Sequence, residues 1–141
     1  MKSYEQNYIN GKWISSDGGT PHQVINPATE EPCTNIVLGS AADVDAAVAA
    51  ATVALKSFSQ TSREERLALL GRIVEEYQKR LPDIAKSLAS EMGAPVGLGM
   101  AAQGPAGLGG FLGTIEALKG FQFSEQHGPN TIMYEPIGVI G

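Results

Sequence analysis

Cysteine is almost absent from this chain. Cys33 is the only one in 141 residues, so no internal disulfide can form. Histidine is nearly as scarce, with His22 and His127 far apart in the sequence. Because a structural zinc site needs about four ligands, one cysteine and two scattered histidines argue against such a site.

Clusters of basic residues are also lacking. The 10 Lys and Arg residues are outnumbered by 15 Asp and Glu residues, which gives a net charge of −5. Arg63 and Arg66 stand on either side of Glu64 and Glu65. Binding of nucleic acid depends on clustered Lys and Arg that neutralise phosphates, so nucleic acid is not expected as a partner.

Long apolar runs are missing as well. No uninterrupted apolar segment is long enough to span a bilayer, and residues 1–13 lack the apolar centre of a secretory signal. We therefore expect no membrane partner and a cytoplasmic location.

The first part of the chain is rich in turn and strand signals. Asn10-Gly11 favours a type I′ turn, whose two central residues both need positive φ, and this predicts a β-hairpin over residues 8–14. A second turn is predicted at 17–19, and short strands are predicted at Val24-Ile25, which Asn26-Pro27 closes, and at 36–38.

Helical spacing begins after residue 39. Ser40 and Ser62 are each followed three residues later by an acidic residue, the pattern of a capping box at a helix start. Apolar residues then recur at helical spacing through both segments. Pro82 is expected to kink or split the second helix, and Gly93 with Pro95 is expected to end it.

Glycine is concentrated in one segment. Residues 97–120 hold eight of the 17 glycines, yet apolar residues at helical spacing predict a helix over 106–119. Each interior glycine costs roughly 1 kcal/mol against alanine, so this helix should depend on packing. The glycines at 107–113 resemble a dinucleotide-binding fingerprint, but no strand leads into them, which argues against a nucleotide site there.

The last residues return to a strand pattern. Strands are predicted at 131–134 and at 137–140, and Gly141 follows the second one directly. A core strand normally leads into a loop and a covering element, so we expect the chain to be a piece of a longer protein. The pattern as a whole predicts an α/β fold: an N-terminal hairpin and short strands, three to four helices and a C-terminal strand pair.

Few side chains are candidates for catalysis. Cys33 follows two glutamates that disfavour the thiolate a nucleophile needs, and His22 and His127 are predicted to be exposed loop residues rather than general bases. Glu91 closes a helix, where its charge opposes the negative end of the helix dipole. Glu91 is therefore either a solvated surface residue or one that a cation compensates.

Six motifs in order resemble the aldehyde dehydrogenase superfamily. Residues 8–14 (YINGKWI) are similar to its opening hairpin, and 24–31 (VINPATEE) to its "INPATGE" strand and turn. Residues 43–51, 62–70 and 91–95 (EMGAP) resemble its first helix, its second helix and its "ETGKP" segment. Residues 135–141 (EPIGVIG) resemble the "EPIGVVG" strand that leads toward the cofactor.

This resemblance implies an oxidoreductase that converts aldehydes to carboxylic acids with NAD or NADP. Residues 1–120 would form the N-terminal part of the dinucleotide-binding domain, and 121–141 would begin the strands of the oligomerisation and bridging region. In the family the catalytic and cofactor-binding residues lie beyond the position of Gly141. No catalytic role and no bound cofactor are therefore expected in this chain alone, and the complete enzyme would be a dimer or tetramer acting on a small aldehyde.

The resemblance also implies one candidate metal site. Several relatives hold a monovalent cation between carbonyls of the "INP" strand and an acidic residue at the "ETG" helix end. The matching positions here are Val24, Ile25 and Glu91.

Two other functions stay open at the level of sequence. The chain could be a stand-alone, non-catalytic binding or assembly module that uses an apolar face. It could also belong to a relative that acts on a semialdehyde or a phosphorylated aldehyde with the same cofactor.

Overall fold

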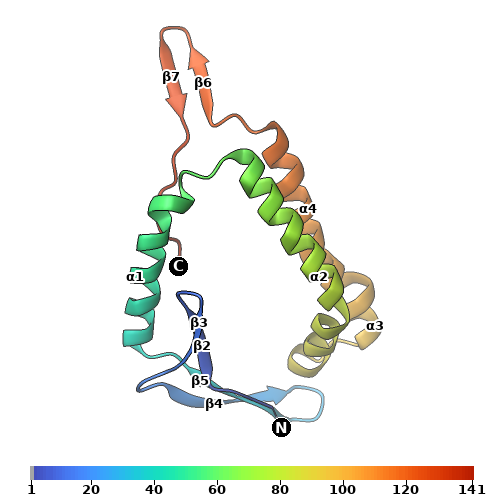
Figure 1. Cartoon of the computed structure of the whole chain (residues 1–141). Helices are drawn as coiled ribbons and strands as arrows, with labels where there is room; N and C mark the ends of the chain where they lie inside the picture. The colour runs from blue at the N-terminus through green and yellow to red at the C-terminus, as the bar shows by residue number, and fades with distance from the viewer. Residues whose placement is uncertain (1) are drawn as a thin grey trace.

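The computed structural model describes residues 2–141 and contains strands and helices in the predicted order (Figure 1). Five strands come first: β1 (Lys2–Tyr4), β2 (Gln6–Ile9), β3 (Lys12–Ser15), β4 (Thr20–Asn26) and β5 (Glu31–Leu38). The helices are α1 (Ala41–Phe58), α2 (Arg63–Met92), α3 (Val96–Leu98), the π-helical turn η1 (Gly99–Gln103) and α4 (Gly104–Gly120). Strands β6 (Ser124–His127) and β7 (Asn130–Met133) follow. This mixture confirms the α/β class.

The N-terminal hairpin forms as predicted. Strands β2 and β3 pair antiparallel, and the turn residues Asn10 and Gly11 have φ of 52° and 76°. These are the positive values that a type I′ turn requires. Tyr8 lies opposite Trp13 in the register, with the two ring centroids 5.1 Å apart. Cross-strand aromatic pairing therefore supports the turn.

The other N-terminal strands form a small sheet in the order β1-β5-β4. Strand β5 pairs antiparallel with β4 and parallel with β1. The register between β4 and β5 shifts between Val24 and Ile25, as a β-bulge does. The strands predicted at 24–25 and 36–38 are thus the ends of longer strands, and β1 was not predicted.

Both predicted capping boxes are present. The backbone N–H of Glu65 donates to Ser62 Oγ at 3.1 Å, and the Ser62 N–H donates to the Glu65 carboxylate at 2.7 Å. At the other end of α2, Gly93 has φ of 71°, the left-handed conformation that ends many helices. The predicted start and end of α2 are therefore confirmed. Both could be predicted because each depends on hydrogen bonds between residues a few positions apart.

Helix α2 is not split at Pro82, in contrast to one of the two outcomes predicted. The helix runs from Arg63 to Met92 through that proline. Leu81 and Ala85, on either side of Pro82, lie against Gly104 and Gly99 of the following helical segment. Packing on both sides of the proline therefore offsets the backbone hydrogen bond that Pro82 cannot donate.

Asp43 ties the start of α1 to the end of β3. Its carboxylate accepts hydrogen bonds from the Ser16 hydroxyl and, at 2.7 Å, from the Ser40 backbone N–H. These two bonds, the Ser16 hydroxyl first, hold the pKa of Asp43 below its ordinary value of 3.8. Because the pKa is lower in the folded state, the ionised Asp43 stabilises the folded chain. This contribution is complete above the unfolded-state pKa and is lost as the pH falls through the folded-state pKa.

We expect Asp43→Asn to lower the urea midpoint of helix unfolding at neutral pH. The difference from wild type should begin to shrink as the pH falls below 3.8, and it should disappear only below the lower folded-state pKa, where the wild-type carboxyl is itself protonated. Far-UV circular dichroism in urea across this range measures it. Asp45→Asn, an exposed position in the same helix, is the matched control. An Asp43→Asn deficit that persists in acid would contradict the linkage.

Close approach of α2 and α4 depends on glycine. A Cβ added at Gly104 would lie 2.6 Å from Leu81 Cδ1 and 2.9 Å from the Gly99 carbonyl oxygen. The Tyr77 hydroxyl donates to the Gly104 carbonyl at 2.9 Å across the same contact. Helix α4 begins at Gly104, two residues before the start predicted from sequence, and the helical segments α3 and η1 precede it from Val96 onward.

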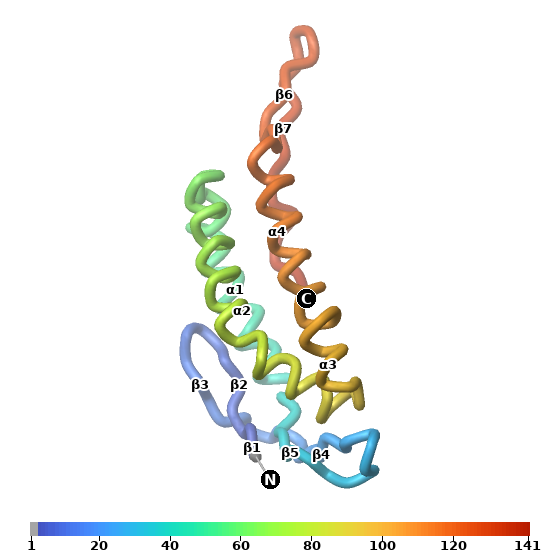
Figure 2. The backbone as a smooth tube through the Cα atoms, turned by 90° about the vertical axis from the view of Figure 1, so that its right-hand side faces the viewer, coloured from blue at the N-terminus to red at the C-terminus, as the bar shows by residue number. Residues whose placement is uncertain are grey.

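The C-terminal strand pair differs from the prediction. The pair is β6 with β7, while residues 134–141 are outside any strand of the described chain. A strand requires a hydrogen-bonded neighbouring strand. The Tyr134 N–H donates to the Phe123 carbonyl at 2.9 Å, but residues 134–141 pair with no strand among residues 2–141. Ile137 and Ile140 are 91% and 77% exposed. Figure 2 shows β6 and β7 projecting beyond the end of α4.

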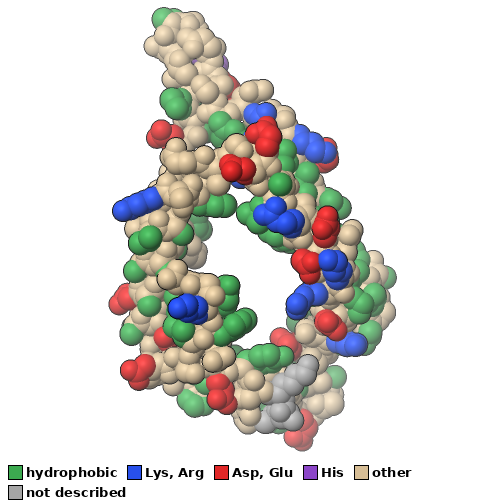
Figure 3. Space-filling model, in the orientation of Figure 1, with side chains coloured by type: hydrophobic (Ala, Val, Ile, Leu, Met, Phe, Trp, Pro, Cys, Tyr) green, Lys and Arg blue, Asp and Glu red, His purple; other side chains and the backbone are tan. Residues whose placement is uncertain are grey.

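The described chain does not enclose a core. Its accessible surface is 10068 Å², whereas a compact protein of 14.8 kDa exposes about 7,000 Å². Ala85 is the only buried hydrophobic residue among those described. The large accessible surface arises because the elements surround an opening instead of packing into it (Figure 3).

Candidate functional site

The sheet meets the C-terminal end of α2 at one thiol. Cys33, half-buried on β5, donates through Sγ to the Val24 carbonyl at 3.3 Å and lies 3.8 Å from the Ser90 carbonyl oxygen. Gly93, directly after α2, is also close to Pro27: an added Cβ would lie 2.9 Å from the proline ring. The end of β4 and the last turn of α2 are therefore neighbours.

This junction brings the elements of the predicted cation site together. Val24 is half-buried and Ile25 is 46% exposed, with the β-bulge between them, while Glu91 is exposed on the last turn of α2. That turn has no basic residue, so no cationic side chain within it compensates Glu91 or the negative end of the helix dipole. Carbonyl and carboxylate oxygens are the ligands that hard cations prefer.

Cys33 has no partner that could activate it as a nucleophile. Both hydrogen bonds to its sulfur involve backbone carbonyl oxygens, which accept a proton but do not stabilise a thiolate. Within residues 2–141, moreover, no three His, Cys, Asp or Glu side chains are close enough to hold a metal ion. Cys33 is a structural residue of a strand here.

The two histidines are in strands, so their predicted placement in loops is wrong. His22 lies in β4 and His127 ends β6, and both are exposed. Their neighbours Pro21 and Gly128 suggested loops, but Pro21 is accommodated in an edge strand and Gly128 lies in the turn that follows β6. The Glu125 carboxylate lies 3.3 Å from His127 Nε2.

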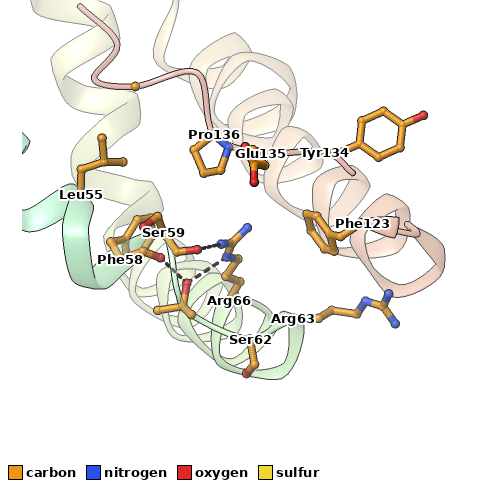
Figure 4. Close-up of a pocket in the computed structure, with 12 residues that line it drawn as sticks. Leu55, Phe58, Ser59, Ser62, Arg63, Arg66, Phe123, Tyr134, Glu135 and Pro136 are labelled. Atoms are coloured by element: carbon orange, nitrogen blue, oxygen red, sulfur yellow. Dashed lines mark hydrogen bonds between the residues drawn. The ribbon is translucent and has the colours of Figure 1, made fainter. Parts of the chain in front are cut away.

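A second region is a hollow of about 640 Å³ between the α1–α2 connection and the last residues of the chain (Figure 4). Arg66 points into it, toward Glu135 and Pro136, while Arg63 points away. Its walls combine apolar and aromatic side chains, among them Leu55, Phe58, Phe123 and Tyr134, with an equal share of polar and charged ones.

Arginines fasten this region together. Arg66 donates to Thr61 Oγ1 at 2.9 Å and to the Ser59 carbonyl at 3.2 Å, and its guanidinium lies 5.4 Å from the Phe123 ring centroid. Arg63 donates to the Phe121 carbonyl. The two arginines therefore fix the base of the β6–β7 hairpin against the start of α2.

Sequence reasoning missed this function of the two arginines. Arg63 and Arg66 were interpreted only as isolated charges among glutamates. Their partners Phe121 and Phe123 are nearly sixty positions away, as the separation of 58 between Arg63 and Phe121 shows. No periodicity within one helix could indicate such contacts.

Comparison with known proteins identifies the family. The model of the aldehyde dehydrogenase family matches residues 13–141. The chain belongs to the aldehyde dehydrogenase family. A curated relative from Staphylococcus aureus (strain bovine RF122 / ET3-1) is 42% identical over 141 residues, which are 100% of this chain and 30% of the relative.

Solved structures of family members share the fold. The aldehyde dehydrogenase of Bartonella henselae has a TM-score of 0.88 and 39% identity, over 92% of this chain and 28% of that one. Aldehyde dehydrogenase C of Pseudomonas syringae, solved with NAD⁺ and octanal, has a TM-score of 0.91 and 37% identity, over 94% and 27%.

The matched region is a minor part of these relatives. The chain spans about 30% of the length of the curated relatives. The family match over residues 13–141 confirms the resemblance that the six motifs indicated. None of the helices in residues 2–141 combines the length and apolar character that crossing a bilayer requires.

Proposed function

We propose that this chain supplies the amino-terminal part of an enzyme that oxidises aldehydes to carboxylic acids with NAD⁺ or NADP⁺. The observation that carries the proposal is the family match over residues 13–141, together with a TM-score of 0.91 to a member solved with NAD⁺ and octanal. The substrate is a small aldehyde, and the assembled enzyme is a cytoplasmic dimer or tetramer.

The proposed division of labour follows the shape of the chain. Residues 1–120 contribute to a dinucleotide-binding domain. The opening in the space-filling view, with α1 on one side and α2 and α4 on the other, is proposed to hold its sheet (Figure 3). Residues 121–141 begin the oligomerisation strands, which fits the projection of β6 and β7 away from the helices (Figure 2).

In this proposal the chain holds structural elements of the enzyme in place and contributes no side chain to the chemical step. A bound NAD(P)⁺ supplies the acceptor for the hydride that leaves the aldehyde carbon. The chain's own residues hold the surrounding elements: Arg63 and Arg66 fix the segment that leads into residues 134–141, and Asp43 fixes α1 to the hairpin. The nucleophile and the base are provided by the remainder of the enzyme.

A joined protein tests this function. The chain replaces the matching first 30% of the Staphylococcus aureus relative, and aldehyde-dependent reduction of NAD⁺ and of NADP⁺ is followed by absorbance. We expect turnover by the joined protein and none by the 141-residue chain alone. The unaltered relative is the control for the assay. A joined protein that folds, binds the dinucleotide and yet turns over no aldehyde would contradict the proposal.

Val24, Ile25 and Glu91 are proposed to hold a monovalent cation in the complete enzyme. The bulge in β4, the adjacent last turn of α2 and the absence of a basic residue in that turn support it. In the joined protein, potassium should raise the melting temperature, and Glu91→Gln should remove most of that increment. Glu116→Gln, on α4, is the matched control. An unchanged potassium effect in Glu91→Gln would count against the site.

A further inference from the structure

Asn10 differs from the other asparagines of the chain in the residue that follows it. The chain has five asparagines, and only Asn10 precedes a glycine. The residues that follow the other four are Tyr8, Pro27, Ile36 and Thr131. A side chain at this position hinders attack of the next backbone nitrogen on the asparagine carboxamide, and proline has no N–H to lose. Gly11 has no Cβ and therefore hinders that attack least.

The two groups that would react are free of other interactions. Asn10 and Gly11 are both exposed. Neither the Asn10 carboxamide nor the Gly11 N–H makes a hydrogen bond within residues 2–141, because the ladder of the hairpin ends at the pair Ile9 and Lys12. The carbon that would be attacked and the nitrogen that would attack it are thus adjacent, accessible and unpaired in the described chain.

The hairpin that carries this turn is weakly held. Strands β2 and β3 form a two-stranded sheet of their own, with no third strand among residues 2–141. A two-stranded hairpin is only marginally stable in water. Its aromatic pair, Tyr8 and Trp13, is 61% and 65% exposed, so opening the hairpin removes little buried surface. Asn10 can therefore leave its turn conformation without unfolding of the helices.

We propose that Asn10 is a site of spontaneous deamidation in the folded chain, with water as the only co-reactant. The Gly11 nitrogen loses its proton and bonds to Cγ of Asn10, while the bond from Cγ to the side-chain nitrogen breaks and ammonia leaves. The product is a succinimide ring. Water then breaks one of the two bonds of the Gly11 nitrogen in that ring. Breaking the bond to Cγ gives aspartate, and breaking the bond to the main-chain carbonyl carbon gives isoaspartate. No oxidant or reductant takes part.

The two products should affect the hairpin differently. Aspartate before glycine is itself a favoured pair for a type I′ turn, so the aspartate product keeps the turn. In isoaspartate the main chain runs through Cβ and Cγ and is longer by one methylene. The φ values of 52° and 76° at Asn10 and Gly11 then no longer define the turn, and the register of Ile9 with Lys12 is lost.

The turn also lies against a helix. Strand β2 contacts α1, and the hairpin stands beside that helix in Figure 1. Asn10 and Gly11 border an open hollow whose other wall consists of alanines of α1, namely Ala47, Ala50, Ala51 and Ala54. Conversion to isoaspartate should therefore loosen the hairpin from α1 as well as separate its strands. The inference is independent of the proposed function, because it concerns the chemistry of the turn alone.

Ageing of the purified 141-residue chain in mildly alkaline native buffer tests the site. Trypsin cleaves after Lys2 and Lys12, so a single peptide carries both Asn7 and Asn10. Fragmentation of that peptide in a mass spectrometer locates the deamidated residue and distinguishes aspartate from isoaspartate. We expect Asn10 to react at least about tenfold faster than Asn7, because glycine follows Asn10 and tyrosine follows Asn7.

Two variants separate the turn chemistry from the opening of the hairpin. Asn10→Gly should remove the reaction and keep the hairpin, since Gly-Gly also supports a type I′ turn. Trp13→Ala removes the aromatic pair, whose ring centroids are 5.1 Å apart, and should accelerate loss of ammonia because the hairpin opens more often. Hydrogen exchange of the aged chain should show loss of protection in β2 and β3 for the isoaspartate product and not for the aspartate product.

Four results would contradict these expectations. A rate at Asn10 no higher than at Asn7 refutes the site. Reaction at Asn10 only after the chain is unfolded in urea also refutes it, since the folded turn would then protect the carboxamide. Equal rates in Trp13→Ala and the wild type overturn hairpin opening as the step that permits attack. Unchanged protection of β2 and β3 in the isoaspartate product overturns the expected release of the hairpin.

Discussion

Gly104→Ala is expected to lower the free energy of unfolding of the α2–α4 pair, while Gly109→Ala in the same helix is expected to raise it. A Cβ at Gly104 would lie under 3.0 Å from both Leu81 Cδ1 and the Gly99 carbonyl oxygen. A Cβ at Gly109 meets nothing within 4 Å. The two substitutions therefore differ in steric environment and not in chemistry.

Both variants gain helix propensity, by about 1 kcal/mol each. Only Gly104→Ala adds overpacking, which costs typically about 1–3 kcal/mol. The free energies of unfolding should therefore differ by about 1–3 kcal/mol in favour of Gly109→Ala. Urea denaturation followed by far-UV circular dichroism measures the difference, and hydrogen exchange of α4 amides locates it.

Gly110→Ala provides a second open position in α4 and should behave like Gly109→Ala. If all three variants are equally stable, α4 is not held against α2 by the close approach at Gly104. The comparison thus tests why this glycine-rich segment is a helix at all.

Local features of this fold could be predicted from sequence. The Asn10-Gly11 turn, the two serine caps and the left-handed Gly93 each depend on residues a few positions apart. Their physical chemistry is complete within a short segment. The boundaries that such signals mark were accordingly predicted to within a few residues.

Features that depend on distant partners could not be predicted. The early start of the α4 region depends on Leu81 and Ala85 accepting glycines against them. The loss of the strand at 137–140 reflects a missing neighbour, although its alternation of residues is strand-like. Periodicity indicates what a segment can form, but pairing and packing decide what it does form.

In the candidate site, too, some features could be predicted from local sequence and others depend on distant contacts. Glu91 could be singled out from sequence because a carboxylate at a helix C-terminus is locally unfavourable. A cation site that joins Glu91 to Val24 and Ile25 was implied only by family resemblance and stays a prediction. The contacts of the Cys33 thiol with β4 and α2 had no signal in the sequence. The contacts of Arg63 and Arg66 were likewise invisible without the fold.

The purified 141-residue chain is expected to bind a hydrophobic dye strongly and to melt over a broad range. Twenty-one large hydrophobic residues are exposed in the described chain, from Tyr4 to Ile140, against one buried alanine. Cooperative unfolding needs a shared core, and here each pair of elements is held mainly by its own contacts. The joined protein is the control, and it should lose most of the dye signal and melt sharply because the opening is filled. A sharp, reversible transition of the monomeric chain with little dye binding would instead favour a stand-alone module, since a closed core would then exist without the remainder of the enzyme.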